Sequence, residues 1–186
     1  MAFDTYPSFD ELLRVPGHLY HNPTNLASEA TWGTLLGYCE TGVTWQPSPV
    51  FVPLTAEETG EEQTELVYAG AYPLLFAVLK NWNVTAIGRL FPGMADGKAV
   101  KFPGSYKPGK LLKASHGAPL LFVPSDQTNN PCLLLQQAVA SLLETAKLIF
   151  SHRKDTLFPA VFRGFRKTDD ADGISYMGLL SGAVLR

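Results

Sequence analysis

Hydrophobic residues fall mostly in short runs bounded by proline and glycine, a pattern typical of a protein made of many β-strands. Strand-like stretches occur at residues 17–22, 43–54, 118–125 and 158–165. The stretch 43–54 alternates, but Pro47, Pro49 and Pro53 interrupt it. Proline cannot donate a ladder hydrogen bond, so this strand is expected at a sheet edge or a bulge. Gly37 and Gly42 are expected in turns nearby.

The stretch 64–80, TELVYAGAYPLLFAVLK, is apolar at both odd and even positions. Alternate side chains of a strand point to opposite faces of a sheet, so both faces of this strand are apolar. Such a strand is buried on both sides, either inside a domain or against a neighbouring subunit.

Two segments carry helical signals. Residues 83–93 form a short helix candidate that Gly88 weakens and Pro92 ends. Residues 132–150 place Leu, Ala, Val and Ile at helical spacing, and no local signal there favours a strand. We divide the chain into an irregular N-terminal segment, residues 1–31, and a single domain, residues 32–186.

Composition places the chain among ordinary globular proteins, with 186 residues, 46% hydrophobic and 17% charged. It holds no apolar run of 18 residues and no signal-like N-terminus, so no membrane partner is expected. Cys39 and Cys132 are far apart in sequence and are expected to be free, buried thiols.

The charges are divided unevenly along the chain. Residues 1–97 hold 11 acids and 3 bases, whereas residues 98–186 hold 6 acids and 12 bases. Two clusters dominate, and they are either solvated loops or complementary surfaces of neighbouring subunits. The candidate interface residues are Glu57, Glu58, Glu61, Glu62 and Glu65 in the first cluster, and Lys98, Lys101, Lys107, Lys110 and Lys113 in the second.

A search for catalytic chemistry yields one near-match, a phosphate-binding pattern at Gly104–Leu111. Leu111 replaces the hydroxyl that would hold Mg²⁺, and Pro108 removes a backbone N–H that would contact phosphate. His18 and His21 lack the partners of a metal site. We therefore assign no catalytic, cofactor-binding or metal-binding residue and expect a protein without enzymatic activity. A nucleotide hydrolase and a monomeric ligand-binding β-domain remain as less favoured alternatives.

Residues 32–62, WGTLLGYCETGVTWQPSPVFVPLTAEETGEE, resemble the opening hairpin of the tail tube proteins of tailed bacteriophages. The matching residues are Leu36-Gly37, Thr41-Gly42-Val43, Glu58 and Gly60. Segments 78–93, 120–165 and 173–185 are similar to later parts of that family and occur in the same order. The resemblance spans roughly residues 18–186, while Cys39 and residues 1–17 depart from the pattern.

This resemblance implies a mainly β fold, an antiparallel β-sandwich or partial barrel with a short flanking α-helix, and strands rather than a helix at residues 132–150. It implies rings of six copies, stacked into a tail tube through which DNA passes without sequence-specific binding. A neck or tail-terminator ring is the alternative. The expected location is the virion tail, after assembly in the host cytoplasm, with copies of itself and other tail or neck proteins as partners. The lysine cluster is expected at subunit contacts or on the exterior, because bases in the channel would retard DNA.

Overall fold

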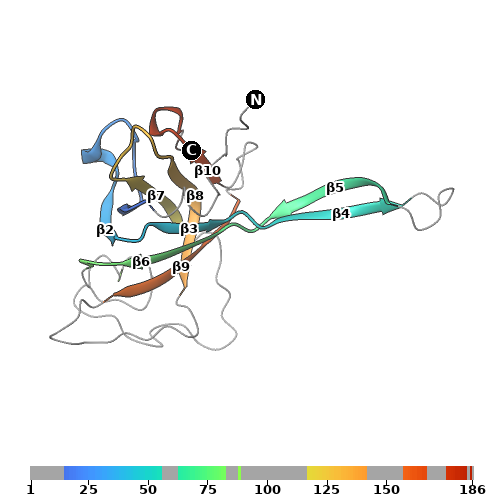
Figure 1. Ribbon diagram of the computed structural model, residues 1–186, viewed down its shortest axis with the longest axis horizontal. Coiled ribbons are helices and arrows are strands. Elements are labelled where there is room, and N and C mark those ends of the chain that lie inside the picture. Colours follow the sequence, from blue (N-terminus) through green and yellow to red (C-terminus); the bar gives the residue numbers. More distant parts are fainter. Residues whose placement is uncertain are drawn as a thin grey trace, which may run out of the picture.

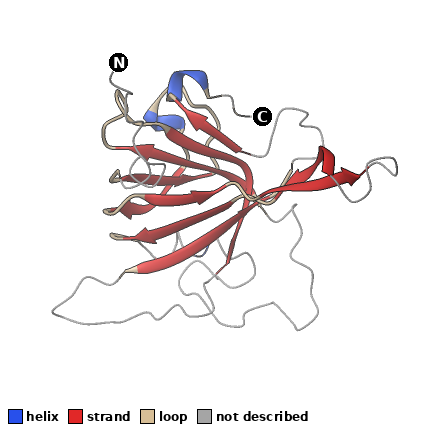
Figure 2. Cartoon of the chain, turned by 45° about the vertical axis from the view of Figure 1, so that its right-hand side comes forward, coloured by secondary structure: helices blue, strands red, loops and turns tan. Residues whose placement is uncertain are grey.

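The computed structural model describes residues 15–55, 63–82, 88, 117–141, 157–166, 175–183 and 185. These residues form an antiparallel eight-stranded sheet and a separate two-stranded hairpin (Figures 1 and 2). The strands are β1 (Gly17–His21), β2 (Thr34–Cys39), β3 (Val43–Gln46), β4 (Pro49–Thr55), β5 (Gln63–Ala71), β6 (Leu74–Leu79), β7 (Ala118–Pro124), β8 (Cys132–Ser141), β9 (Phe158–Gly164) and β10 (Ser175–Gly178). Two short 3₁₀ helices, η1 (Glu29–Thr31) and η4 (Leu180–Gly182), complete the described elements.

The large sheet has the strand order β2-β1-β7-β8-β9-β6-β3, and β10 pairs with β8. It is an open sheet, but it curls so that β2 meets the end of β6. There the backbone N–H groups of Tyr38 and Lys80 each donate to the carbonyl of the other residue, at 2.8 and 2.7 Å. Gly37 makes this approach possible, because a Cβ at that position would lie 2.9 Å from the Lys80 carbonyl oxygen.

The expectation that Gly37 lies in a turn was therefore wrong: this glycine is part of β2, and its missing side chain serves a close strand contact. Gly42 does lie between β2 and β3, with a positive φ of 77° that a glycine adopts without strain.

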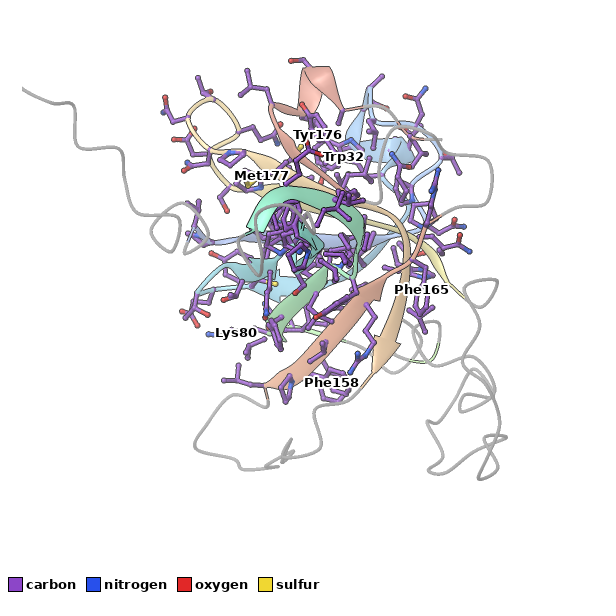
Figure 3. The ribbon with its side chains drawn as sticks, turned by 90° about the vertical axis from the view of Figure 1, so that its right-hand side faces the viewer. Trp32, Lys80, Phe158, Phe165, Tyr176 and Met177 are labelled. Atoms are coloured by element: carbon purple, nitrogen blue, oxygen red, sulfur yellow. The ribbon has the colours of Figure 1, made fainter. Side chains whose placement is uncertain are left out.

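Both faces of the central strands are buried. The inner core contains Leu19, Leu75, Leu135 and Phe162, among others. A second cluster on the outer face contains Tyr20, Leu26, Trp32, Leu121, Val123 and Leu134. The C-terminal segment adds side chains to each cluster, because neighbouring residues of β10 point to opposite faces: Tyr176 packs on the outer cluster and Met177 on the inner core (Figure 3).

The structure confirms the mainly β fold and the strand at the start of segment 132–150. β8 pairs with β7, β9 and β10, and residues 132–135 are all buried. A helix would have buried only one stripe of these apolar side chains, whereas the central strand buries both faces, so tertiary burial overrides helical propensity. Residues 142–150 lie outside the described residues.

Other parts of the expected architecture differ from what is observed. In place of a sandwich, the described residues form a hairpin and one open sheet, which curls so that β2 meets the end of β6, and they include no complete α-helix. Apart from Gly88, the helix candidate at 83–93 lies outside them. Residues 1–14 lie outside them too, whereas β1 occupies an interior position of the sheet, between β2 and β7.

The two cysteines are free and buried, as the sequence predicts. Removal from water disfavours the charged thiolate. Burial therefore raises the pKa of the Cys39 thiol to about 12 and that of Cys132 to about 11.

Candidate functional site: a projecting apolar arm

One long hairpin runs from the sheet out into solvent. Its inner part is β3 paired with β6, and its outer part is β4 paired with β5. The inner part belongs to the large sheet, whereas the outer part extends away from the body, as Figure 1 shows. We call this outer part, residues 49–55 and 63–71, the arm.

The arm separates from the sheet at two short connections, Pro47-Ser48 on one strand and Tyr72-Pro73 on the other. The prolines lack the N–H groups that would continue the ladder. Ser48 has a positive φ of 43°, and its carbonyl accepts a hydrogen bond from the Tyr72 N–H at 3.3 Å. The proline-rich stretch thus ends one ladder and begins another, and β4 pairs only with β5 among the described strands. The predicted edge position of this strand is confirmed.

Apolar side chains cover both faces of the arm. Residues that pair directly across two strands share a face. One face carries the Phe51–Tyr68 pair, whose ring centroids lie 5.7 Å apart with the rings edge to face, and the opposite face carries Val52 beside Val67. The exposed apolar side chains of the arm and its base are Val50, Phe51, Val52, Leu54, Leu66, Val67, Tyr68 and Tyr72.

The arm exposes a large amount of apolar surface for so short a ribbon. The eight residues are between 36% and 59% exposed. Since a large side chain buries about 150–250 Å², they present roughly 700 Å² in all. Divided between the two faces, this is roughly 350 Å² per face, a size at which the largest apolar patch of a monomer, about 300–600 Å², is often functional. A two-stranded ribbon is also marginally stable by itself in water. The arm therefore has the properties of a surface that a partner covers.

The arm also shows which surroundings the two apolar faces of segment 64–80 have. The sequence predicted burial either inside the domain or against a neighbouring subunit. Burial inside the domain is correct for β6, where Leu75 and Leu79 are buried. It does not hold for β5, where Leu66 and Tyr68 are more than half exposed. Sequence reasoning did not separate the two halves. The break at Tyr72-Pro73 is the signal that could have done so.

The predicted interface residues fall almost entirely outside the described part of the chain. Glu65 is described, lies on β5 and is exposed. The remaining acids, Glu57, Glu58, Glu61 and Glu62, belong to the segment that links β4 to β5 in the sequence, and this segment is not described. The five lysines and Gly104–Leu111 also lie outside the described residues, so the pairing of the two charge clusters stays a prediction.

A pocket of about 580 Å³ lies at the base of the arm. Its lining includes Trp45 of β3, Tyr68 of β5, the prolines of the two connections, and Arg166 and Ser175 from the body. A second hollow of about 690 Å³ lies elsewhere, between Asn25, Gln127 and Leu180. The pocket at the base of the arm is notable because it adjoins the exposed apolar surface. Nothing in the sequence indicated that Arg166 would border this pocket.

Among the described residues, no three His, Cys, Asp or Glu side chains lie close enough together to bind a metal ion. His18 and His21 are three positions apart on β1, so their side chains leave the strand on opposite faces. His18 instead lies against Tyr38, with ring centroids 5.1 Å apart. In the same described part of the chain, no helix is long and apolar enough to cross a membrane.

Comparison with known proteins finds no matching family model and no matching curated protein.

Proposed function

We propose that this protein is a self-assembling structural component of a bacteriophage tail, whose copies form stacked rings around a channel for DNA. The observation that carries the proposal is the arm, which exposes apolar side chains on both faces. Strands of that composition are stable in water when neighbouring chains cover them.

The length of the arm supports coverage by another molecule. β4 has seven residues, and a strand advances about 3.3 Å per residue, so the arm reaches roughly 20 Å beyond the sheet. Its apolar area, roughly 700 Å², is close to the 800 Å² or so that each partner contributes to a standard protein interface. The arm can thus form a complete contact.

A second copy of the chain is the partner we favour. An arm on one copy that binds a different surface on the next is a head-to-tail contact, and such contacts generate closed rings or open filaments. This outcome fits the tail-tube-like architecture that the resemblance implies, with six copies in each ring. A neck or tail-terminator ring uses the same contact without extended stacking and is the alternative.

Purified protein examined by negative-stain electron microscopy and sedimentation velocity tests the proposal. We expect rings or tubes whose amount rises with protein concentration. Single rings that never stack would favour the neck or terminator alternative. A sample that stays monomeric at high concentration would refute self-assembly.

A matched pair of variants tests whether the arm is responsible. Leu66 on the arm and Leu179 after β10 are each 56% exposed, so their replacement by serine removes the same apolar group from equally exposed sites. Leu66→Ser is expected to reduce assembly, and Leu179→Ser is expected to leave it near the wild-type level. Equal effects of the two variants would show that the arm has no special role.

A further inference from the structure

We infer that the arm docks on a second copy by strand addition, with β5 of one copy pairing along the free edge of β10 in the next. This inference rests on the proposed function, since it names the backbone surfaces that form the contact between copies. An exposed sheet edge binds an extended segment readily, because its outward backbone groups lack hydrogen-bond partners.

The two strands of the arm offer different outer edges. In an antiparallel pair, the backbone groups of one residue face the partner strand and those of the next residue face away from it. Proline is found in a strand where its nitrogen faces away from the partner, so Pro49 and Pro53 mark the outer edge of β4 and remove two donors from it. β5 contains no proline. Of the two arm strands, only β5 therefore presents an outer edge with all its backbone donors.

Pairing across the arm identifies the residues that lie on these outer edges. Two directly paired residues either face each other with their backbone groups or both face away. Leu66 pairs with Pro53, and Tyr68 pairs with Phe51, which is two positions from Pro53. The N–H groups of Leu66 and Tyr68 therefore point outwards from β5, and that of Phe51 points outwards from β4.

The receiving edge belongs to β10. β7 occupies one edge of β8, so β9 and β10 both lie along its other edge. β6 covers the far edge of β9, where the Gly164 N–H also donates to the Pro73 carbonyl at 2.8 Å. On the N-terminal side of Pro73, the chain leaves the body as the arm (Figure 1). Among the described strands, β10 pairs with β8 alone, and its far edge is open.

The side chains of β10 show what kind of strand fits beside it. Tyr176 packs on the outer cluster and Met177 on the inner core (Figure 3). Both are half-buried, whereas Leu134 and Leu133, with which they pair on β8, are buried. An added strand must therefore bring apolar side chains to both faces. β5 does so, because the consecutive residues 66–69, Leu-Val-Tyr-Ala, are all apolar and exposed.

The added strand comes from another copy of the chain. Among the described strands, β5 pairs only with β4, and the arm extends away from the body (Figure 1). The chain thus has a strand of the required pattern and an edge that fits it, and it does not pair the two within one molecule. Pairing between copies is a head-to-tail contact, as a closed ring requires. It also gives the arm a third strand, and three or more strands are needed for a sheet to be stable in water.

Amide hydrogen exchange tests the pairing directly. Assembled protein is exposed to D₂O, returned to monomers in a solvent that preserves the labels, and examined by NMR. We expect the Leu66 and Tyr68 amides to exchange about tenfold or more slowly in the assembly than in the monomer, because they donate to β10. The Phe51 amide, on the proline-containing edge, should keep its monomer rate.

Proline substitutions test the same donors by assembly. Leu66→Ala removes the side chain and keeps the N–H group, whereas Leu66→Pro removes both. We expect Leu66→Pro to need about fivefold or more protein for half-assembly than Leu66→Ala, because one interchain hydrogen bond is lost. Phe51 provides the matched control on β4, where the proline and alanine variants should assemble alike.

Crosslinking identifies the strand that β5 meets. Copies carrying Ala69→Cys are mixed with copies carrying Ser175→Cys and treated with a short bismaleimide, so that a product containing both copies is intermolecular. The native cysteines are buried. We expect this product from the assembled mixture. A mixture of Ala69→Cys with Ser28→Cys, an exposed position before η1, should give none.

The outcomes separate this inference from the proposed function. If rings form while Leu66 and Tyr68 exchange as in the monomer and the two Leu66 variants assemble alike, strand addition is wrong and self-assembly stands. If the β5 amides are protected but Ala69→Cys does not link to Ser175→Cys, the receiving edge is not β10. If the wild-type protein does not assemble at all, both proposals are wrong.

Discussion

Replacement of Phe51 by alanine should weaken assembly much more than it weakens the folded monomer. Phe51 is 51% exposed on the aromatic face of the arm. For a side chain of about 200 Å², that leaves roughly 100 Å² for a neighbouring copy to cover. At about 25 cal/mol per Å², its burial is worth about 2.5 kcal/mol per contact. The dissociation constant of the contact should therefore rise by roughly 50-fold or more.

Within the monomer, the same change removes mainly the edge-to-face contact with Tyr68. Aromatic pairs of this kind are worth about 0.5–1.5 kcal/mol, so the thermal midpoint should fall only slightly. Sedimentation velocity over a concentration series measures assembly, and circular dichroism on heating measures folding.

Leu157→Ala provides the control for Phe51→Ala. Leu157 is 44% exposed and precedes Phe158, which pairs with Leu79 at the end of β6 remote from the arm. This variant should assemble as the wild type does. Assembly of Phe51→Ala at the wild-type concentration, or an assembly defect no larger than its loss of folding stability, would show that Phe51 is not part of the contact between copies.

Three further predictions concern the core and the loops. The free energy of unfolding should fall as pH rises from about 9 towards 12, because the Cys39 thiol, with its pKa raised to about 12 in the fold, loses its proton more readily once unfolded. At pH 10.5 this amounts to about 2 kcal/mol, so urea denaturation of Cys39→Ala should show a shallower fall between pH 8 and 10.5 than the wild type; parallel curves would contradict the assignment. Gly37→Val should lower the free energy of unfolding by about 1–3 kcal/mol, because even a Cβ there would lie 2.9 Å from the Lys80 carbonyl oxygen. An unchanged midpoint in urea denaturation would show that β2 can move away without cost. The double variant Lys107→Glu/Lys110→Glu should weaken assembly in a salt-dependent way and leave the monomer folded by circular dichroism; unaffected assembly would mean that this lysine cluster is only solvated surface.

Local sequence features were sufficient to locate most of the described strands. Alternating or continuous apolar runs bounded by Gly and Pro mark β1, β7 and β9, and each is a strand in the structure. The prolines of segment 43–54 also predicted an edge strand, because a missing N–H is a property of the residue itself.

The segment now seen as β8 could not be settled in the same way. Its apolar residues satisfy a helical stripe as well as a strand with two buried faces, and local propensity favours the helix. The strand forms because β7, β9 and β10 supply hydrogen-bonding partners along it, and apolar side chains then cover both of its faces. Those partners are distant in sequence, so the local pattern contains no information about them.

Residue type and spacing were enough to predict that the protein is rich in strands, that its cysteines are buried thiols, and that residues 64–80 have two apolar faces. Which half of that apolar stretch lies in the core depends on how the strands pair in the folded protein. The ladder breaks at Pro47-Ser48 and Tyr72-Pro73, so β6 joins the sheet while β5 leaves it with its apolar side chains exposed. The break also brings Trp45, Tyr68 and Arg166 around one pocket. Burial depends on what the rest of the chain places beside a strand, and for this reason the arm and its pocket emerge only from the folded protein.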